Sequence, residues 1–301
     1  MERETLKKAG VLILTFGITA YLIHKVYAEA SQIHLTPSQL LSPYTLIAVL
    51  LGITGYLLYT TTWYLYLSNV AEVSYRRVLL ANLSGTYLSF SLNAAIGTLI
   101  KVKFIGAKYF QVLATSLLEV STEFLTGFTF IFITTRDPKA LLVVAFFLLV
   151  FLADDKVYAA IMAIVRKLGR GDGVFKEFYD GWHEGKANPR RVALAMALGT
   201  TLVLVNAGIL ISVAKVFGVT IPLATAVAAI LYSEFLGSAL GTPGGVGGNE
   251  LGVIMAIGNS GIDVVIAFFF KFINQYAFAL VGAVAFYHFV SKEVEGKGIN
   301  E

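Results

Sequence analysis

The sequence predicts an all-α polytopic membrane protein, because of its composition, its long apolar segments and the distribution of its basic residues. Hydrophobic residues make up 57% of the 301 residues and charged residues only 14%, whereas soluble domains carry about 25% charged residues. This composition excludes an ordinary soluble enzyme, a disordered protein and a nucleic-acid-binding protein. The lack of cysteine excludes disulfides, zinc–thiolate sites, iron–sulfur clusters and a cysteine nucleophile.

Six segments are apolar enough to cross the membrane as helices, which takes about 20 residues each. They are residues 11–27, 44–67, 112–134, 140–153, 192–214 and 264–290, and the fourth reaches the required length if it begins near Thr135. The first segment also resembles a secretory signal, because two lysines precede it and Ala28-Glu-Ala30 follows it. A first span is the favoured interpretation in a protein with many spans.

Two further apolar segments are interrupted. Residues 78–100 are expected to break at Gly85, Asn93 and Gly97. Residues 221–258 contain the run Gly241-Thr-Pro-Gly-Gly-Val-Gly-Gly-Asn-Glu250, which cannot continue a helix because of its glycines and its proline. The one substantial polar stretch is residues 154–191, in which residues 175–182 predict an interfacial helix with aromatic rings towards lipid.

The positive-inside rule favours two re-entrant hairpins over eight simple spans. If residues 78–108 enter and leave on the cytoplasmic side, and residues 221–258 on the outer side, the long polar loop is cytoplasmic. The alternative, in which residues 221–240 simply span, stays open because 20 residues suffice. Eight simple spans would place outside the basic residues Lys156, Arg166, Lys167, Arg170, Lys176, Lys186, Arg190 and Arg191.

The favoured topology divides a single transmembrane domain, residues 1–301, into two halves with the same order of elements. Residues 1–134 and residues 135–301 each read as span, span, re-entrant hairpin, span, and the second half starts from the opposite side of the membrane. Such an inverted-topology repeat is typical of secondary transporters, where paired broken helices face a site near the midplane. We expect a multi-pass protein of the plasma membrane with both termini in the cytoplasm.

Polar residues within the apolar segments are the candidate binding residues. Broken helices persist in a membrane only where they line a cavity or pack in protein, and the N–H groups at a helix start favour an anion such as phosphate. The alternative is that the glycines only permit tight helix packing. The candidate substrate-binding residues are Asn93, Gly97, Thr98, Lys101, Glu119, Glu123, Glu234, Thr242, Pro243, Gly244, Gly245, Gly247, Asn249, Glu250 and Lys271.

Glu119 and Glu123 are four residues apart and therefore share one helical face. Two carboxylates on such a face could bind a cation or a proton, or could pair with Lys101 or Lys271. Charges in membrane helices are costly and are usually functional or paired. The alternative is an ion-pair network that only fixes helix packing.

Other chemistry has little support in the sequence. The four histidines (His24, His34, His183 and His288) lack the helical spacing of a metal site, and no phosphate loop for ATP is present. No Gly-x-Ser-x-Gly nucleophile elbow occurs with an accompanying histidine and acid. We therefore expect no cofactor, no metal and no catalytic residue.

The run from Thr242 to Glu250 resembles the Pro-Gly-Gly-Leu-Gly-x-x-Glu block of the lysylphosphatidylglycerol synthase transmembrane region, or flippase-like, family. Residues 93–101 resemble its first-half Asn/Pro–Gly–basic block, residues 119 and 123 fit its acidic pair, and Lys271 stands where the family has a basic residue, commonly arginine. The sequence departs from the family at residues 94–95, where proline is common, and at Lys101 and Val120, where arginine is typical.

The family includes lipid flippase domains fused to soluble transferase domains, and stand-alone membrane proteins. Because the sequence ends at Glu301, soon after the last predicted span, the resemblance implies translocation and no synthase activity. The leading hypothesis is a flippase-like transporter that moves a phosphate-bearing polar lipid or lipid-linked head group between leaflets. The alternatives are a membrane subunit that partners a separate cytoplasmic lipid-modifying transferase, and an ion-coupled transporter of a small solute.

Overall fold

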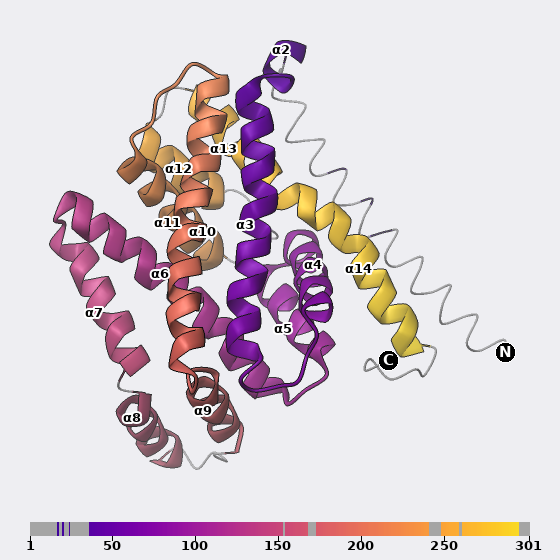
Figure 1. Cartoon of the computed structure of the whole chain (residues 1–301), viewed down its shortest axis with the longest axis vertical. Coiled ribbons are helices and arrows are strands. Elements are labelled where there is room, and N and C mark those ends of the chain that lie inside the picture. The colour runs from indigo at the N-terminus through magenta and orange to yellow at the C-terminus, as the bar shows by residue number, and fades with distance from the viewer. Residues whose placement is uncertain are drawn as a thin grey trace. The chain divides into compact units, whose positions relative to one another are not determined.

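A computed structural model describes residues 17, 20, 24, 36–152, 154–167, 173–240, 248–258 and 261–294, and these residues are helical apart from short connections (Figure 1). The predicted all-α class is therefore confirmed. The predicted first span, residues 11–27, lies almost entirely outside the described residues, as do residues 241–247 of the glycine-rich run. The helices are α2 (Pro37–Leu40), α3 (Pro43–Leu67), α4 (Tyr75–Ser91), α5 (Ala94–Ile105), α6 (Tyr109–Thr135), α7 (Pro138–Leu152), α8 (Asp154–Lys167), α9 (Gly173–Gly185), α10 (Pro189–Val216), α11 (Leu223–Leu240), α12 (Gly248–Ile257), α13 (Ile262–Lys271), a π-helix (Phe272–Tyr276) and α14 (Ala277–Val294).

Among the described residues, four helical segments are long and apolar enough to cross a membrane. They are α3, α6, α10 and the continuous segment Ile262–Lys292, and they match four of the predicted spans. The predicted segment 140–153 lies in α7, which begins at Pro138 and does not gain length by starting near Thr135, because α6 continues to Thr135. Arg136, in the left-handed conformation with φ 57°, ends α6, and α7 then begins with Pro138, a residue favoured at the first position of a helix.

The chain forms two compact units, and the boundaries between them fall within α3, at the start of α4, between α5 and α6, and within α10. Unit 1 comprises Met1–Tyr56, Arg76–Gly106 and Val205–Glu301, and unit 2 comprises Leu57–Tyr75 and Ala107–Leu204. In unit 1, Tyr56 stacks on Phe278 with ring centroids 4.2 Å apart. In unit 2, the Tyr66 hydroxyl shares a buried hydrogen bond of 2.7 Å with Thr122, which fastens α3 to α6.

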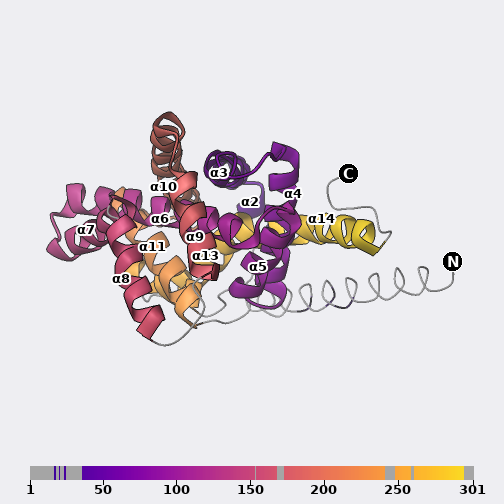
Figure 2. The ribbon, with the colours of Figure 1, turned by 90° about the horizontal axis from the view of Figure 1, so that it is seen from below.

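The first interrupted segment forms a helical hairpin in unit 1, in which α4 and α5 lie beside one another (Figures 1 and 2). The chain leaves the helix at Leu92 and Asn93, so the predicted break at Asn93 is confirmed. The breaks expected at Gly85 and Gly97 are wrong, because both glycines lie inside helices. A Cβ atom on Gly97 would clash with the carbonyl oxygen of Gly85, which shows how closely the two backbones approach.

The second interrupted segment forms another hairpin in unit 1 from α11 and α12. A Cβ atom on Gly252 would lie 2.5 Å from the Cα atom of Ser233, and one on Gly248 would lie 2.6 Å from the carbonyl oxygen of Leu236. Both hairpins are therefore built on glycines that bring helix backbones together. The second helix of each is short: 12 residues in α5 and 10 in α12, or about 18 Å and 15 Å against a hydrocarbon core of about 30 Å.

Alanine at Gly97 or Gly252 should destabilise the protein, although alanine is the better helix former. The added methyl group meets backbone atoms of the facing helix, which cannot move aside as a flexible side chain can. We expect a loss of about 1–3 kcal/mol in the free energy of unfolding, as for an overpacked core. Thermal unfolding in detergent measures the change.

The control is Gly173→Ala in α9, where no atom from elsewhere in the described residues lies within 4 Å of the added methyl group. This variant should unfold at the wild-type temperature or slightly above it. A Gly97→Ala or Gly252→Ala protein as stable as Gly173→Ala would show that the hairpins do not depend on these glycine contacts.

Candidate functional site

A buried ion pair joins the second hairpin to the last membrane helix of unit 1. Lys271 Nζ, at the end of α13, lies 2.6 Å from Glu250 Oε1 in the first turn of α12. The Lys271 side chain is 3% exposed and that of Glu250 is 16% exposed. The neighbouring Asn249 donates a hydrogen bond of 3.4 Å from Nδ2 to Gln275 Oε1 in the π-helix. Two polar contacts thus hold the start of α12.

Two aromatic rings lie beside the same ammonium group. The Lys271 Nζ atom is 5.8 Å from the ring centroid of Phe90 and 5.3 Å from that of Tyr276, distances at which a ring face attracts a cation. The two rings contact one another edge to face, with centroids 5.3 Å apart. Because Phe90 belongs to α4, Lys271 touches the first hairpin as well as the second.

The π-helix that follows Lys271 was missed by the sequence analysis, which expected one uninterrupted span over residues 264–290. A π-helix inside an α-helix frequently marks a functional site. It contains neither proline nor glycine, and the only available signal was the polar pair Asn274-Gln275 within an apolar segment. On the neighbouring α3, a Cβ atom on Gly52 would lie 3.3 Å from the carbonyl oxygen of Ile273, so α3 approaches the π-helix backbone closely.

In the first hairpin, the predicted residues surround the start of α5. Asn93 is the N-cap, and its Oδ1 atom accepts a hydrogen bond of 2.8 Å from the backbone N–H of Ile96. Gly97 is buried in the contact with α4, Thr98 is half-buried, and Lys101 is 5% exposed. Asn93 thus satisfies one of the N–H groups that the helix start leaves open.

The predicted carboxylates are divided between the two units. Glu119 and Glu123 lie on α6 in unit 2 and are 1% and 9% exposed, and Glu234 is half-buried on α11 in unit 1. Glu250, also in unit 1, pairs with Lys271. The remaining predicted residues, Thr242, Pro243, Gly244, Gly245 and Gly247, lie outside the described residues.

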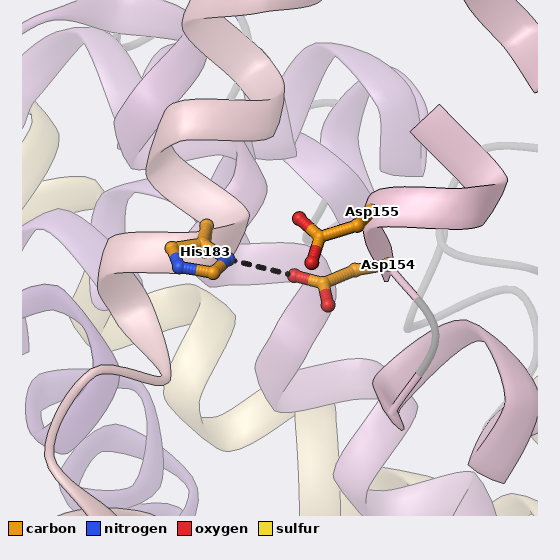
Figure 3. A group of neighbouring side chains, drawn as sticks. All are labelled: Asp154, Asp155 and His183. Carbon is orange, nitrogen blue, oxygen red and sulfur yellow. Dashed lines mark hydrogen bonds and ion pairs between the residues drawn. The ribbon is translucent and has the colours of Figure 1, made fainter. Parts of the chain in front are cut away.

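A separate polar cluster links α8 to α9 in unit 2, where Asp154, Asp155 and His183 lie close together (Figure 3). Lys186 Nζ lies 2.9 Å from Asp154 Oδ2, and His183 Nδ1 lies 3.2 Å from the same oxygen atom. Asp155 accepts a hydrogen bond from the Tyr179 hydroxyl. Since Lys186 supplies positive charge beside these carboxylates, the cluster is an ion-paired connection between the two helices.

The charges of this connection shift the titration of Asp154. Partial burial opposes its ionisation, but the hydrogen bond and positive charge of Lys186, followed by those of His183, hold the pKa of Asp154 below its ordinary value. A lowered pKa in the folded state means that the stabilisation is complete above the ordinary pKa of an aspartate. It is lost as the pH falls through the lowered pKa, so the connection is intact at neutral pH.

The helices of membrane-spanning length and the buried charges among them define an integral membrane protein. A family model, described as the lysylphosphatidylglycerol synthase TM region, matches residues 9–282. This match covers most of the chain, so the chain belongs to that family, and the resemblance noted in the sequence is confirmed. No curated protein and no solved structure matches the chain.

Proposed function

We propose that this chain is a flippase-like transporter that moves a phosphate-bearing polar lipid or lipid-linked head group between leaflets. The observation that carries the proposal is the buried Lys271–Glu250 pair, which touches both glycine-packed hairpins of unit 1. A lysine and a carboxylate inside a membrane protein are expensive to maintain, and such charges mark substrate or ion pathways. Membership of a family of membrane regions of lipid-related proteins supports a lipid as the substrate.

Five of the candidate residues have an assigned role in this proposal. Lys271 and Lys101 attract the phosphate. The start of α5, which Asn93 caps, adds backbone N–H groups that donate hydrogen bonds to it. Glu119 and Glu123, buried on α6 in unit 2, carry a coupling proton. The lipid crosses without covalent change, so these residues bind and release and none is catalytic.

The short second helices of the hairpins support a re-entrant arrangement. At about 18 Å and 15 Å, α5 and α12 each cover about half of the hydrocarbon core. Hairpins that enter from opposite faces would bring the start of α5 and the start of α12 near the midplane, as in an inverted-topology transporter. The basic loop around α8 and α9 would then face the cytoplasm of a plasma-membrane protein.

The Lys271→Gln protein should fold and purify like the wild type but lose phospholipid movement in proteoliposomes. Glu250 is the more exposed partner, at 16%, and can be hydrated once Lys271 is replaced, whereas transport needs the ammonium group. The double variant Lys271→Gln/Glu250→Gln should therefore stay inactive. Lys292→Gln, at the end of α14, is the matched lysine control and should keep wild-type transport.

The opposite result would identify a structural ion pair. Removing one member of a buried pair then costs about 3–5 kcal/mol of stability, and removing the other member restores it. If Lys271→Gln unfolded readily and the double variant regained both stability and transport, the pair would be a scaffold and this site assignment would fail.

Single cysteines in this cysteine-free chain test the proposed orientation. A cysteine replacing the exposed Lys176 on α9 should be shielded from impermeant thiol reagents in intact cells, because positive charge keeps this loop cytoplasmic. A cysteine replacing the exposed Lys215 near the end of α10 should react from outside. Reaction at residue 176 together with protection at residue 215 would show that the protein has the opposite orientation to the one proposed.

A further inference from the structure

We propose that a cavity at the junction of α3, α9 and α10 binds the phosphate of an anionic phospholipid. The cavity has a volume of about 460 Å³, within the range of small-molecule sites, which is about 300–1,000 Å³. It belongs to unit 2, whereas the Lys271–Glu250 pair belongs to unit 1, so the inference does not rest on the proposed transport. The residues that line the cavity are Asn69, Ala187, Asn188, Pro189 and Arg190.

The cavity lies at the end of two membrane helices. α3 ends at Leu67 and α10 begins at Pro189, and both helices are long and apolar enough to cross a membrane. Arg191 Nη1 joins the two helix ends, because it donates hydrogen bonds of 2.9 Å to the carbonyl oxygen of Ser68 and 2.7 Å to Asn69 Oδ1. Since the apolar parts of both helices stop here, lipid head groups are the neighbours of this cavity.

Hydrogen bonds within unit 2 fix the walls of the cavity. Asn69 donates from Nδ2 to the carbonyl oxygen of Gly185, at 2.7 Å. Asn188 Oδ1 accepts hydrogen bonds of 3.1 and 3.2 Å from the backbone N–H groups of Arg190 and Arg191. These bonds occupy two N–H groups at the start of α10, so we assign the recognition of phosphate to side chains. A cavity with fixed walls loses less entropy when a ligand binds.

The side chains that remain available suit a phosphate. The Arg190 guanidinium is exposed and has no hydrogen bond or ion pair with another described residue, and a planar guanidinium can bind two phosphate oxygens at once. The Asn188 Nδ2 group has no partner in the described part of the chain either, and it can donate a further hydrogen bond. No carboxylate is among the described residues that line the cavity, and the nearby Glu184 is exposed on α9.

Two neighbouring positive charges favour an anionic over a zwitterionic phospholipid. The partners of the Arg191 side chain are a carbonyl and an amide oxygen, so within the described residues no carboxylate pairs with Arg191 or with Arg190. An anionic phospholipid brings a net negative charge to these two guanidinium groups. A zwitterionic phospholipid also brings an ammonium group, which they repel. Basic pockets at the ends of membrane helices bind anionic head groups for this reason.

Protection of a single cysteine from alkylation tests the site. Ala187 is exposed in the cavity wall, and Ala187→Cys in this cysteine-free chain gives a thiol that a bound head group covers. Because most of the lining residues are exposed, the lipid exchanges with detergent during purification and is added back. The rate of reaction with N-ethylmaleimide, a neutral reagent, is measured on the full-length protein with phosphatidylglycerol, phosphatidylethanolamine or inorganic phosphate.

Phosphatidylglycerol should halve the rate at a concentration about tenfold below that of phosphatidylethanolamine, because only the former has a net charge. Inorganic phosphate lacks the acyl chains that hold a lipid beside the helices, so it should protect only at far higher concentrations. A cysteine at Lys176, exposed on α9 outside the cavity, should react at the same rate with and without lipid.

Arg190→Gln in the Ala187→Cys protein should raise the phosphatidylglycerol concentration needed for protection about fivefold, as expected for one basic residue at a membrane surface. Lys167→Gln, which removes an exposed charge at the end of α8 in the same unit, should leave the protection unchanged. Thermal unfolding of each variant confirms that it is folded.

Each contrary result has a distinct meaning. Equal protection by the two lipids, or unchanged protection after Arg190→Gln, would overturn the inference. Protection by inorganic phosphate at the same concentration as by phosphatidylglycerol would also overturn it and would identify a soluble phosphate compound as the ligand. Absence of protection by all three would show that the cavity binds no phosphate. The transport proposal depends on Lys271 and on phospholipid movement, so it is tested separately.

Discussion

Close contact between helix backbones is the constraint on which unit 1 depends. Lipid offers no hydrogen-bond partners, so the ends of short helices must be covered by protein. Gly97 in the first hairpin and Gly252 in the second allow this cover, because each lets a facing backbone approach where a Cβ atom would clash. The same packing fixes the start of α12, and with it the carboxylate of Glu250 beside Lys271.

The sequence predicted the long membrane helices well, because hydropathy over about 20 residues depends little on tertiary context. It placed helix breaks at Gly85 and Gly97, since the low helix propensity of glycine is a local property, whereas their role in packing depends on the facing helix. It likewise named Lys271 and Glu250 but did not pair them, because their contact requires α12 to fold back against α13. The π-helix has no distinctive composition to reveal it.

Under the proposed function, the buried ion pair provides charges for a polar head group without a permanent electrostatic penalty. Glu250 neutralises Lys271, and two aromatic rings lie beside the ammonium group. A pair of this kind contributes little net stability compared with apolar packing, so its presence in an apolar protein favours a functional explanation.

Native mass spectrometry of the purified protein tests the central claim most directly, because it identifies the lipid that the site retains. The account predicts that the wild type carries a phosphate-bearing lipid and that the Lys271→Gln protein, purified in the same way, has lost it. A wild-type protein without bound phospholipid, or a Lys271→Gln protein that retains the same lipid to the same extent, would contradict the account.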